Sequence, residues 1–107
     1  MRTGSRIQIV LADDTEWIGA AGDYTELHVH GRSHLLRETM SFLEQKLDPA
    51  RFLRIHRSRI VRTDCILELR SIDNHEYLVK LSDGSEYRSS RSYARRLEEW
   101  LDSAKAE

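Results

Sequence analysis

The chain is poor in cysteine and lacks any long apolar stretch, and each shortage excludes a class of protein. Cys65 is the only cysteine among 107 residues, so a disulfide within the chain and a zinc site of several cysteines are both excluded. No apolar run approaches the roughly 18 residues of a membrane span, so we expect no membrane segment. Between Asp64 and Ile66, Cys65 is interpreted as a small strand residue that fills the core.

Signatures of catalysis and of RNA binding are missing as well. The chain has no nucleophile elbow, no phosphate-cradling glycine loop and no metalloprotease motif, so we predict no enzyme, no catalytic residue and no cofactor. Aromatic residues make up only 7% of the chain, and no strand carries the aromatic cluster on which RNA bases stack. Met1 leads into an alternating segment rather than a continuous apolar one, so we expect no signal peptide and a cytoplasmic location.

Lysine is also scarce, because arginine supplies most of the positive charge. Fourteen arginines stand against three lysines. Residues 49–63 hold five of these arginines and residues 87–97 hold four, and neither window contains a carboxylate. A formal net charge of −1 therefore conceals two basic windows in an otherwise acidic chain. The guanidinium fork suits phosphate oxygens and the guanine edge, whereas a solvated face laced with ion pairs would need local acids that both windows lack.

The first half of the chain is predicted to be mostly β, with one short helix. At 107 residues, with 39% hydrophobic and 33% charged residues, the chain suits a single globular domain. Apolar residues recur at helical spacing from Met40 to Leu47, which predicts a helix with Thr39 as its N-cap and Asp48-Pro49 as its end. Before this helix, alternating apolar and polar residues predict strands at 7–11, 17–20, 26–30 and 34–37.

The second half is predicted to contain a basic turn followed by three strands. Leu53 and Ile55 share one face of a strand, and the alternation then breaks at residues 57–59. We therefore place the basic cluster on a turn rather than inside a ladder of strands. The three strands that follow form a meander at 66–72, 77–81 and 86–88.

An apolar stripe near the end of the chain predicts a C-terminal helix. Its members, at i, i+4, i+7 and i+8, are Tyr93, Leu97, Trp100 and Leu101. Ser89 or Ser90 is the predicted N-cap, and Arg91 and Arg95 lie off the stripe. No second helix precedes it by a few residues, so the two-helix geometry of a helix-turn-helix cannot be built here.

These segments together resemble the LytTR-type DNA-binding domain, the output module of many bacterial response regulators of the LytR/AlgR kind. The resemblance covers nearly the whole chain. Its parts are Trp17 to Tyr24, Leu36 to Met40, Phe52 to Val61, Leu81 to Gly84 and Ser90 to Tyr93. One departure is Arg62-Thr63, where the family commonly has asparagine.

The resemblance implies a mainly β fold of about ten short strands in small sheets with short helices, not a helix-turn-helix. It implies a single domain at residues 6–104, with tails at 1–5 and 105–107. It further implies sequence-specific binding to double-stranded DNA in transcription regulation, with loops inserted into the major groove. Such domains usually bind direct repeats as pairs of molecules and bend the DNA, which adds specificity at bases the protein does not touch. They usually follow a receiver or sensor domain, which these residues do not contain.

By the same resemblance, the contact regions fall on Gly22 to Tyr24, His56 to Arg59 and Ser90 to Ser92. Arg57 takes the position after the motif histidine, where the family places a base-contacting side chain, and pairing with guanine provides about 1–3 kcal/mol of discrimination. Arg91 starts the C-terminal helix, where free backbone amides also favour phosphate. Three further arginines are predicted to contact phosphate, namely Arg54, Arg59 and Arg95. The remaining predicted contacts are Asp23, Tyr24, His56, Ser58, Ser90 and Ser92.

Several of these residues also have a structural interpretation. His56 can hold the turn through backbone hydrogen bonds instead of touching a base, and Tyr24, beside a turn, can be half-buried packing. His28 and His30, two apart on a predicted strand, would place both imidazoles on one face, with His34 just beyond the turn, which makes a metal site a minor alternative. We predict no metal, because two histidines on a polar face are usually just solvated.

The main rival function is a protein-interaction module whose arginine loops bind an acidic partner. Such a module should show little preference among duplex sequences. A transcription factor should instead favour its own site by several orders of magnitude at physiological salt.

Overall fold

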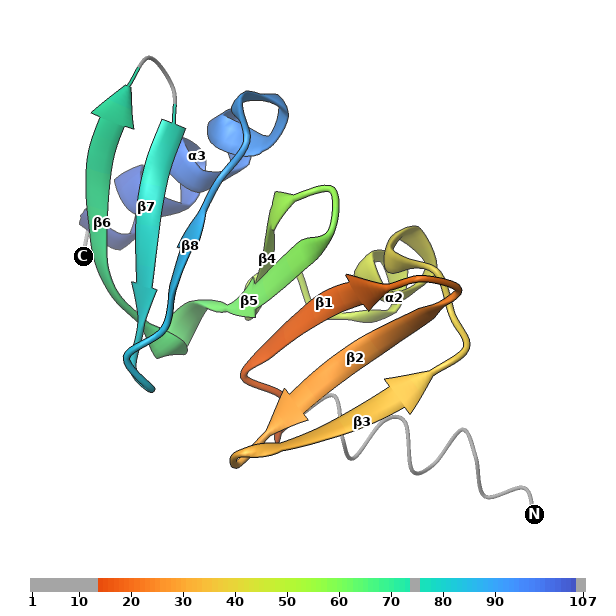
Figure 1. Cartoon of the computed structure of the whole chain (residues 1–107). Helices are drawn as coiled ribbons and strands as arrows, with labels where there is room; N and C mark the ends of the chain where they lie inside the picture. The colour runs from red at the N-terminus through yellow and green to blue at the C-terminus, as the bar shows by residue number, and fades with distance from the viewer. Residues whose placement is uncertain (1–13, 74–75, 106–107) are drawn as a thin grey trace.

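The structure, a computed structural model, describes residues 14–73 and 76–105 (Figure 1). Eight strands in these residues form two antiparallel sheets, accompanied by two α-helices and two short 3-10 helices. The mainly β fold predicted from the sequence is confirmed. The strand predicted at 7–11 lies outside the described residues. Among the residues that are described, no helix is both long and apolar enough to cross a membrane.

The first sheet has five strands in the order β3-β2-β1-β5-β4. They are β1 (Trp17–Ala21), β2 (Tyr24–Val29), β3 (Arg32–Leu36), β4 (Phe52–His56) and β5 (Arg59–Arg62). In the β2–β3 turn, His30 and Gly31 both have positive φ, at 50° and 81°, as a tight hairpin of matching twist requires. β2 therefore ends one residue earlier than predicted, and β3 begins two residues earlier.

The second sheet is the predicted meander, in the order β6-β7-β8. Its strands are β6 (Ile66–Asp73), β7 (Glu76–Leu81) and β8 (Glu86–Arg88). In the β7–β8 turn, Asp83 Oδ1 accepts hydrogen bonds from the Ser85 hydroxyl at 2.5 Å and the Ser85 backbone N–H at 2.9 Å. These bonds stabilise the carboxylate and lower the pKa of Asp83 from its ordinary value.

The short helix α2 (Met40–Lys46) begins where the sequence predicts. Thr39 Oγ1 accepts a hydrogen bond from the Phe42 backbone N–H at 3.0 Å, which confirms Thr39 as the N-cap. Met40 and Leu43 are buried, so the helix presents its apolar side to the first sheet. A helix of seven residues is too short to be stable alone, and the cap and this packing hold it in place.

Removing the cap tests how much α2 depends on it. Thr39→Ala is expected to lower the free energy of unfolding by about 1 kcal/mol, because the Phe42 N–H loses its acceptor. Urea denaturation followed by circular dichroism measures this change. Gln45→Ala, at an exposed position of the same helix, is the matched control and is expected to leave stability unchanged or slightly higher. Equal stability of the two variants would show that the cap contributes nothing.

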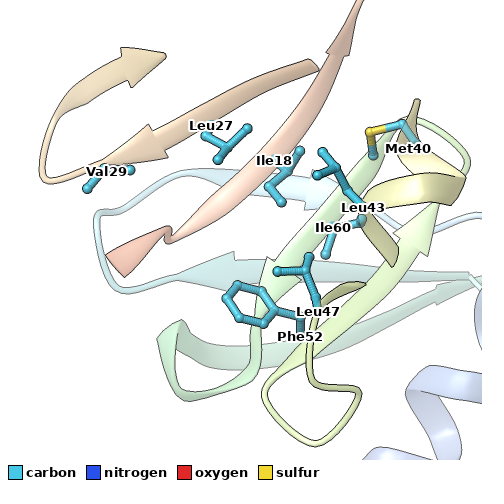
Figure 2. Close-up of a cluster of buried hydrophobic side chains, with 8 residues drawn as sticks. All are labelled: Ile18, Leu27, Val29, Met40, Leu43, Leu47, Phe52 and Ile60. Carbon is cyan, nitrogen blue, oxygen red and sulfur yellow. The ribbon is translucent and has the colours of Figure 1, made fainter. Parts of the chain in front are cut away.

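Two buried clusters lie on opposite sides of the hairpin formed by β4 and β5. The first cluster joins the first sheet to α2 (Figure 2) and contains Ile18, Leu27, Val29, Met40, Leu43, Leu47, Phe52 and Ile60. The second joins this hairpin to the second sheet and the C-terminal helix and contains Leu53, Ile55, Val61, Cys65, Val79, Leu81 and Leu97. Successive strand residues point to opposite faces, so the hairpin contributes to both clusters. The hairpin that carries the turn is therefore packed on both faces.

Three sequence predictions are corrected by the structure. Cys65 is buried in the second cluster as predicted, but it ends the 3-10 helix η1 (Thr63–Cys65) rather than lying in a strand. The helix α3 (Ala94–Lys105) is preceded by a 3-10 turn, η2 (Arg91–Tyr93). Neither predicted serine cap forms. The Ser90 hydroxyl makes no capping bond, and the buried Ser89 hydroxyl instead accepts from the Tyr77 N–H at 3.0 Å, because β7 needs that acceptor.

Five strands separate α2 from α3, so the described elements contain no helix-turn-helix. Figure 1 shows α3 behind the second sheet, with the β4–β5 hairpin on the side of the first sheet that faces the second.

Candidate nucleic-acid interface

Backbone hydrogen bonds place β1 and the segment before α3 against the β4–β5 hairpin. The Ala20 N–H, near the end of β1, donates to the Ser58 carbonyl at 3.0 Å. The Ser90 N–H, just before η2, donates to the Ile55 carbonyl at 2.9 Å. The turn after β1 and the segment before α3 therefore flank the β4–β5 turn (Figure 1). Segments far apart in the sequence are thus brought close to the β4–β5 turn.

His56 and Ser58 close the β4–β5 turn from within. The Ser58 backbone N–H donates to His56 Nδ1 at 3.2 Å, and Ser58 Oγ lies 3.0 Å from the same nitrogen. Because a backbone N–H can only donate, Nδ1 is the acceptor and the neutral ring carries its proton on Nε2. His56 thus holds the turn, as the structural interpretation of this residue proposed, and the Nε2–H remains as a donor.

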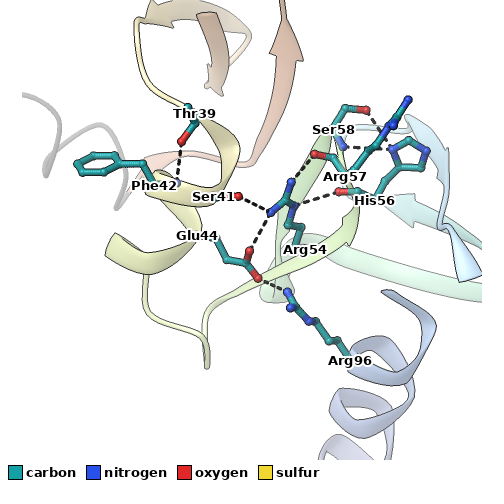
Figure 3. A network of polar contacts seen from close by, with 9 residues as sticks. All are labelled: Thr39, Ser41, Phe42, Glu44, Arg54, His56, Arg57, Ser58 and Arg96. Carbon is teal, nitrogen blue, oxygen red and sulfur yellow. Dashed lines mark hydrogen bonds and ion pairs between the residues drawn. The ribbon is translucent and has the colours of Figure 1, made fainter. Parts of the chain in front are cut away.

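Arg57 stands at the tip of this turn. Its side chain is exposed and points away from the polar network beneath it (Figure 3). Within the described residues its guanidinium makes no hydrogen bond or ion pair, while its backbone carbonyl accepts a bond from Arg54. The Arg57 carbonyl is held by Arg54, and the Arg57 guanidinium is exposed to solvent.

Arg54 does not fit the predicted phosphate contact. Its side chain is 9% exposed, and Nη1 donates to Glu44 Oε1 at 2.9 Å. Nη2 donates to the Arg57 carbonyl at 2.6 Å and Nε to the His56 carbonyl at 3.4 Å. A phosphate would have to displace these partners, so the geometry assigns Arg54 to the support of the turn.

Arg59 was placed on the turn by the sequence, but it lies in β5, opposite Gly19. Its guanidinium packs against two rings that also contact each other, 4.3 Å from the centroid of Trp17 and 4.0 Å from that of Tyr87. A Cβ at Gly19 would come within 3.1 Å of Arg59 Nη1, so this glycine leaves room for the stack. Burial lowers the pKa of Arg59, which nevertheless stays cationic at neutral pH. These contacts link the two sheets, because Trp17 lies in β1 and Tyr87 in β8.

The segment before α3 presents exposed arginines. Arg91 Nε lies 3.9 Å from Glu76 Oε2 with 70% of its side chain exposed, and such surface pairs contribute about 0–1 kcal/mol. Arg91 is thus readily released to another anion. Ser92 is exposed, Ser90 is half-buried, and Arg95, on the first turn of α3, is exposed without a hydrogen bond or ion pair to any described residue.

The turn after β1 differs in charge from the other two regions. Gly22, with φ of 65°, allows the reversal, and Asp23 beside it is exposed. Tyr24 is 41% exposed, so part of this residue packs against the domain while the rest faces solvent. A carboxylate on this edge repels phosphate and suits only a donor such as the amino group of cytosine.

The geometry that made a metal site an alternative is absent. β2 ends at Val29, and His30 lies in the turn with φ of 50°, so His28 and His30 do not share a strand face. The His28 ring instead stacks on Trp17, its cross-strand neighbour, with centroids 3.5 Å apart.

The fold and this edge define a class of protein: a mainly β domain that presents arginines on joined loops. Residues 5–102 match the sequence model of the LytTr DNA-binding domain family. The chain belongs to this LytTR family, as the sequence resemblance predicted, and is a DNA-binding domain of the kind found in bacterial response regulators.

Two curated relatives and one solved structure illustrate the likeness. The chain is 31% identical over 101 residues to the sensory transduction protein LytT of Bacillus subtilis (strain 168), covering 94% of this chain and 42% of that protein. It is 34% identical over 76 residues to the transcriptional regulatory protein LytR of Staphylococcus aureus (strain MW2), covering 71% and 31%. A solved LytTr DNA-binding domain from Bacillus cereus shares the fold, with a TM-score of 0.78 at 21% identity and coverage of 84% and 83%. The chain thus spans less than half of these curated relatives.

Proposed function

We propose that this chain binds double-stranded DNA sequence-specifically and regulates transcription, with its loops inserted into the major groove at promoter repeats. The observation that supports this most is that the Ala20–Ser58 and Ser90–Ile55 hydrogen bonds bring β1 and the segment before α3 beside the hairpin that carries Arg57. Base readout and charge neutralisation would then occur on one surface.

Each predicted contact takes a role that its surroundings allow. Arg57 reads a base, because it is exposed and its backbone is held. Arg91 and Arg95 neutralise phosphates beside Ser90 and Ser92, since these arginines are exposed and at most weakly paired. The other proposed contacts are the His56 Nε2–H, Ser58, Asp23, Tyr24 and the edge of the Arg59 guanidinium.

Pairing of two molecules on direct repeats is part of the same proposal. Because the chain spans 42% of its LytT relative, we also propose that a receiver or sensor domain accompanies it in a longer protein. Signal input would then change the local concentration of two DNA-binding domains rather than the surface of either one.

Selection of bound duplexes from a random DNA pool tests the proposal. At about 150 mM salt the non-specific electrostatic contribution is weakened, so enrichment reports base readout. We expect a repeat of half-sites separated by about one helical turn. If no motif is enriched while an acidic protein binds through the same arginines, the interaction-module alternative replaces DNA readout.

A further inference from the structure

The Arg54 side chain donates hydrogen bonds to the backbone of the β4–β5 turn. Its Nη2 and Nε donate to two successive carbonyls, those of Arg57 at 2.6 Å and His56 at 3.4 Å (Figure 3). The β4–β5 pairing shifts register between Arg54 and His56, so an irregularity lies directly beneath the turn. Such bulges change the direction in which the following residues point. Arg54 lies on one side of this bulge and hydrogen-bonds to the His56 and Arg57 carbonyls on the other.

Glu44, on α2, holds Arg54 in turn. Its Oε1 accepts from Arg54 Nη1 at 2.9 Å, and its Oε2 pairs with Arg96 on α3. The Tyr93 ring of η2 also contacts both arginines, with its centroid 5.2 Å from the Arg54 guanidinium carbon and 5.0 Å from that of Arg96. A single carboxylate thereby connects α2, the β4–β5 hairpin and α3.

The position of Arg54 depends on this carboxylate. The Arg54 side chain is 9% exposed, and its other acceptors are neutral: the hydroxyl of Ser41 and two backbone carbonyls. Removing one partner of a poorly solvated ion pair leaves the remaining charge uncompensated. Arg54 would then turn toward solvent and release the carbonyls of the turn.

We propose that Glu44 is a positioning residue for DNA recognition: through Arg54 it fixes the turn that carries Arg57, and so sets the preference for the cognate site. This inference rests on the proposed function. Glu44 itself does not contact DNA; its carboxylate is occupied by two arginines.

The direction in which Glu44→Gln changes DNA affinity distinguishes a positioning role from a general electrostatic effect of the removed charge. Glu44→Gln removes a negative charge close to the candidate interface, so long-range electrostatics alone would strengthen binding to every duplex. Loss of positioning weakens only the cognate site. We therefore expect about tenfold weaker binding to the selected duplex, the loss typical of a charge-assisted hydrogen bond, and no weakening toward a scrambled one.

The experiment titrates the wild type, Glu44→Gln and a control against the selected and scrambled duplexes at fixed salt. Glu68→Gln is the matched control, since Glu68 is an exposed acid in an ion pair with Arg70 on the other sheet. It makes the same change of charge and is expected to leave the ratio of cognate to scrambled affinity unchanged. Thermal melts show that each variant is folded at the assay temperature.

Arg54→Lys provides an independent test should Glu44→Gln fail to fold. Lysine keeps the charge, but its single ammonium cannot reach Glu44 and both carbonyls together. Arg54→Lys should lower the ratio of cognate to scrambled affinity about as much as Glu44→Gln. The variant that combines both substitutions should lower this ratio little further, because both act through the Glu44–Arg54 ion pair.

The outcomes are distinguishable. A wild type that prefers its site, together with Glu44→Gln and Arg54→Lys variants that keep the same ratio, overturns the positioning role and leaves the proposed function intact. Additive losses in the double variant also overturn it. A wild type without any preference overturns the proposed function and this inference with it.

Discussion

Arg57→Ala is expected to lower affinity for the selected site by about 10- to 100-fold while relaxing base preference at one position. The guanidinium is exposed at the tip of the turn, and a bidentate pair with guanine is worth about 1–3 kcal/mol of discrimination. Fluorescence anisotropy with the selected duplex and its single-base variants measures the change. The penalty for substituting the base that Arg57 reads should shrink in the variant.

Arg95→Ala is the matched comparison for Arg57→Ala. It removes the same side chain from an exposed position of α3, but from a residue assigned to phosphate. We expect weaker binding to all duplexes alike and a salt slope flatter by about one unit. The reverse pattern, with Arg95→Ala relaxing base preference and Arg57→Ala flattening the slope, would exchange the two roles.

Trp17→Ala is expected to cause the largest loss of stability, about 3 kcal/mol, or a fall in Tm of about 10–20 °C. The Trp17 ring contacts His28 of β2 at 3.5 Å, the Arg59 guanidinium at 4.3 Å and Tyr87 of β8 at 5.1 Å between centres. Its removal takes a packing partner from both sheets and leaves Arg59 with one ring. Chemical denaturation followed by Trp100 fluorescence, the only tryptophan then remaining, measures the loss.

Two further variants define what the Trp17 ring contributes. Trp17→Phe keeps an aromatic face for His28 and Arg59 and is expected to recover more than half of the lost stability. Leu35→Ala, at a position 62% exposed on β3, should change stability by less than about 0.5 kcal/mol. If Trp17→Ala is no more destabilising than Leu35→Ala, the stack does not hold the two sheets together.

Much of the fold follows from local rules that act within a few residues. Alternation places Leu53 and Ile55 on one face, and both lie in the second cluster. Thr39 caps α2 because a threonine oxygen reaches the N–H three residues ahead in any helix start of this geometry. The meander of β6, β7 and β8 follows from short connections between neighbouring strands, and local patterns of this kind also carried the family resemblance.

The roles of single arginines depend on partners that are distant in the sequence. Arg54 and Arg57 are three residues apart in the same basic window, yet one is held by Glu44 and the other is uncommitted. No sequence pattern near Arg54 predicts its ion pair with Glu44, because Glu44 lies in another element, α2. The same holds for Arg59, because the Trp17 and Tyr87 rings that contact it lie in β1 and β8.

The sequence by itself determined the family, the strand pattern, the N-cap of α2 and the places where arginine concentrates, because periodicity and capping act over neighbouring residues. Only the tertiary structure decided which arginines remain exposed. Packing brings Glu44 to Arg54, and Trp17 and Tyr87 to Arg59, across distances in the sequence that no local pattern spans. Arg57 keeps its side chain outward because the hairpin beneath it is packed on both faces.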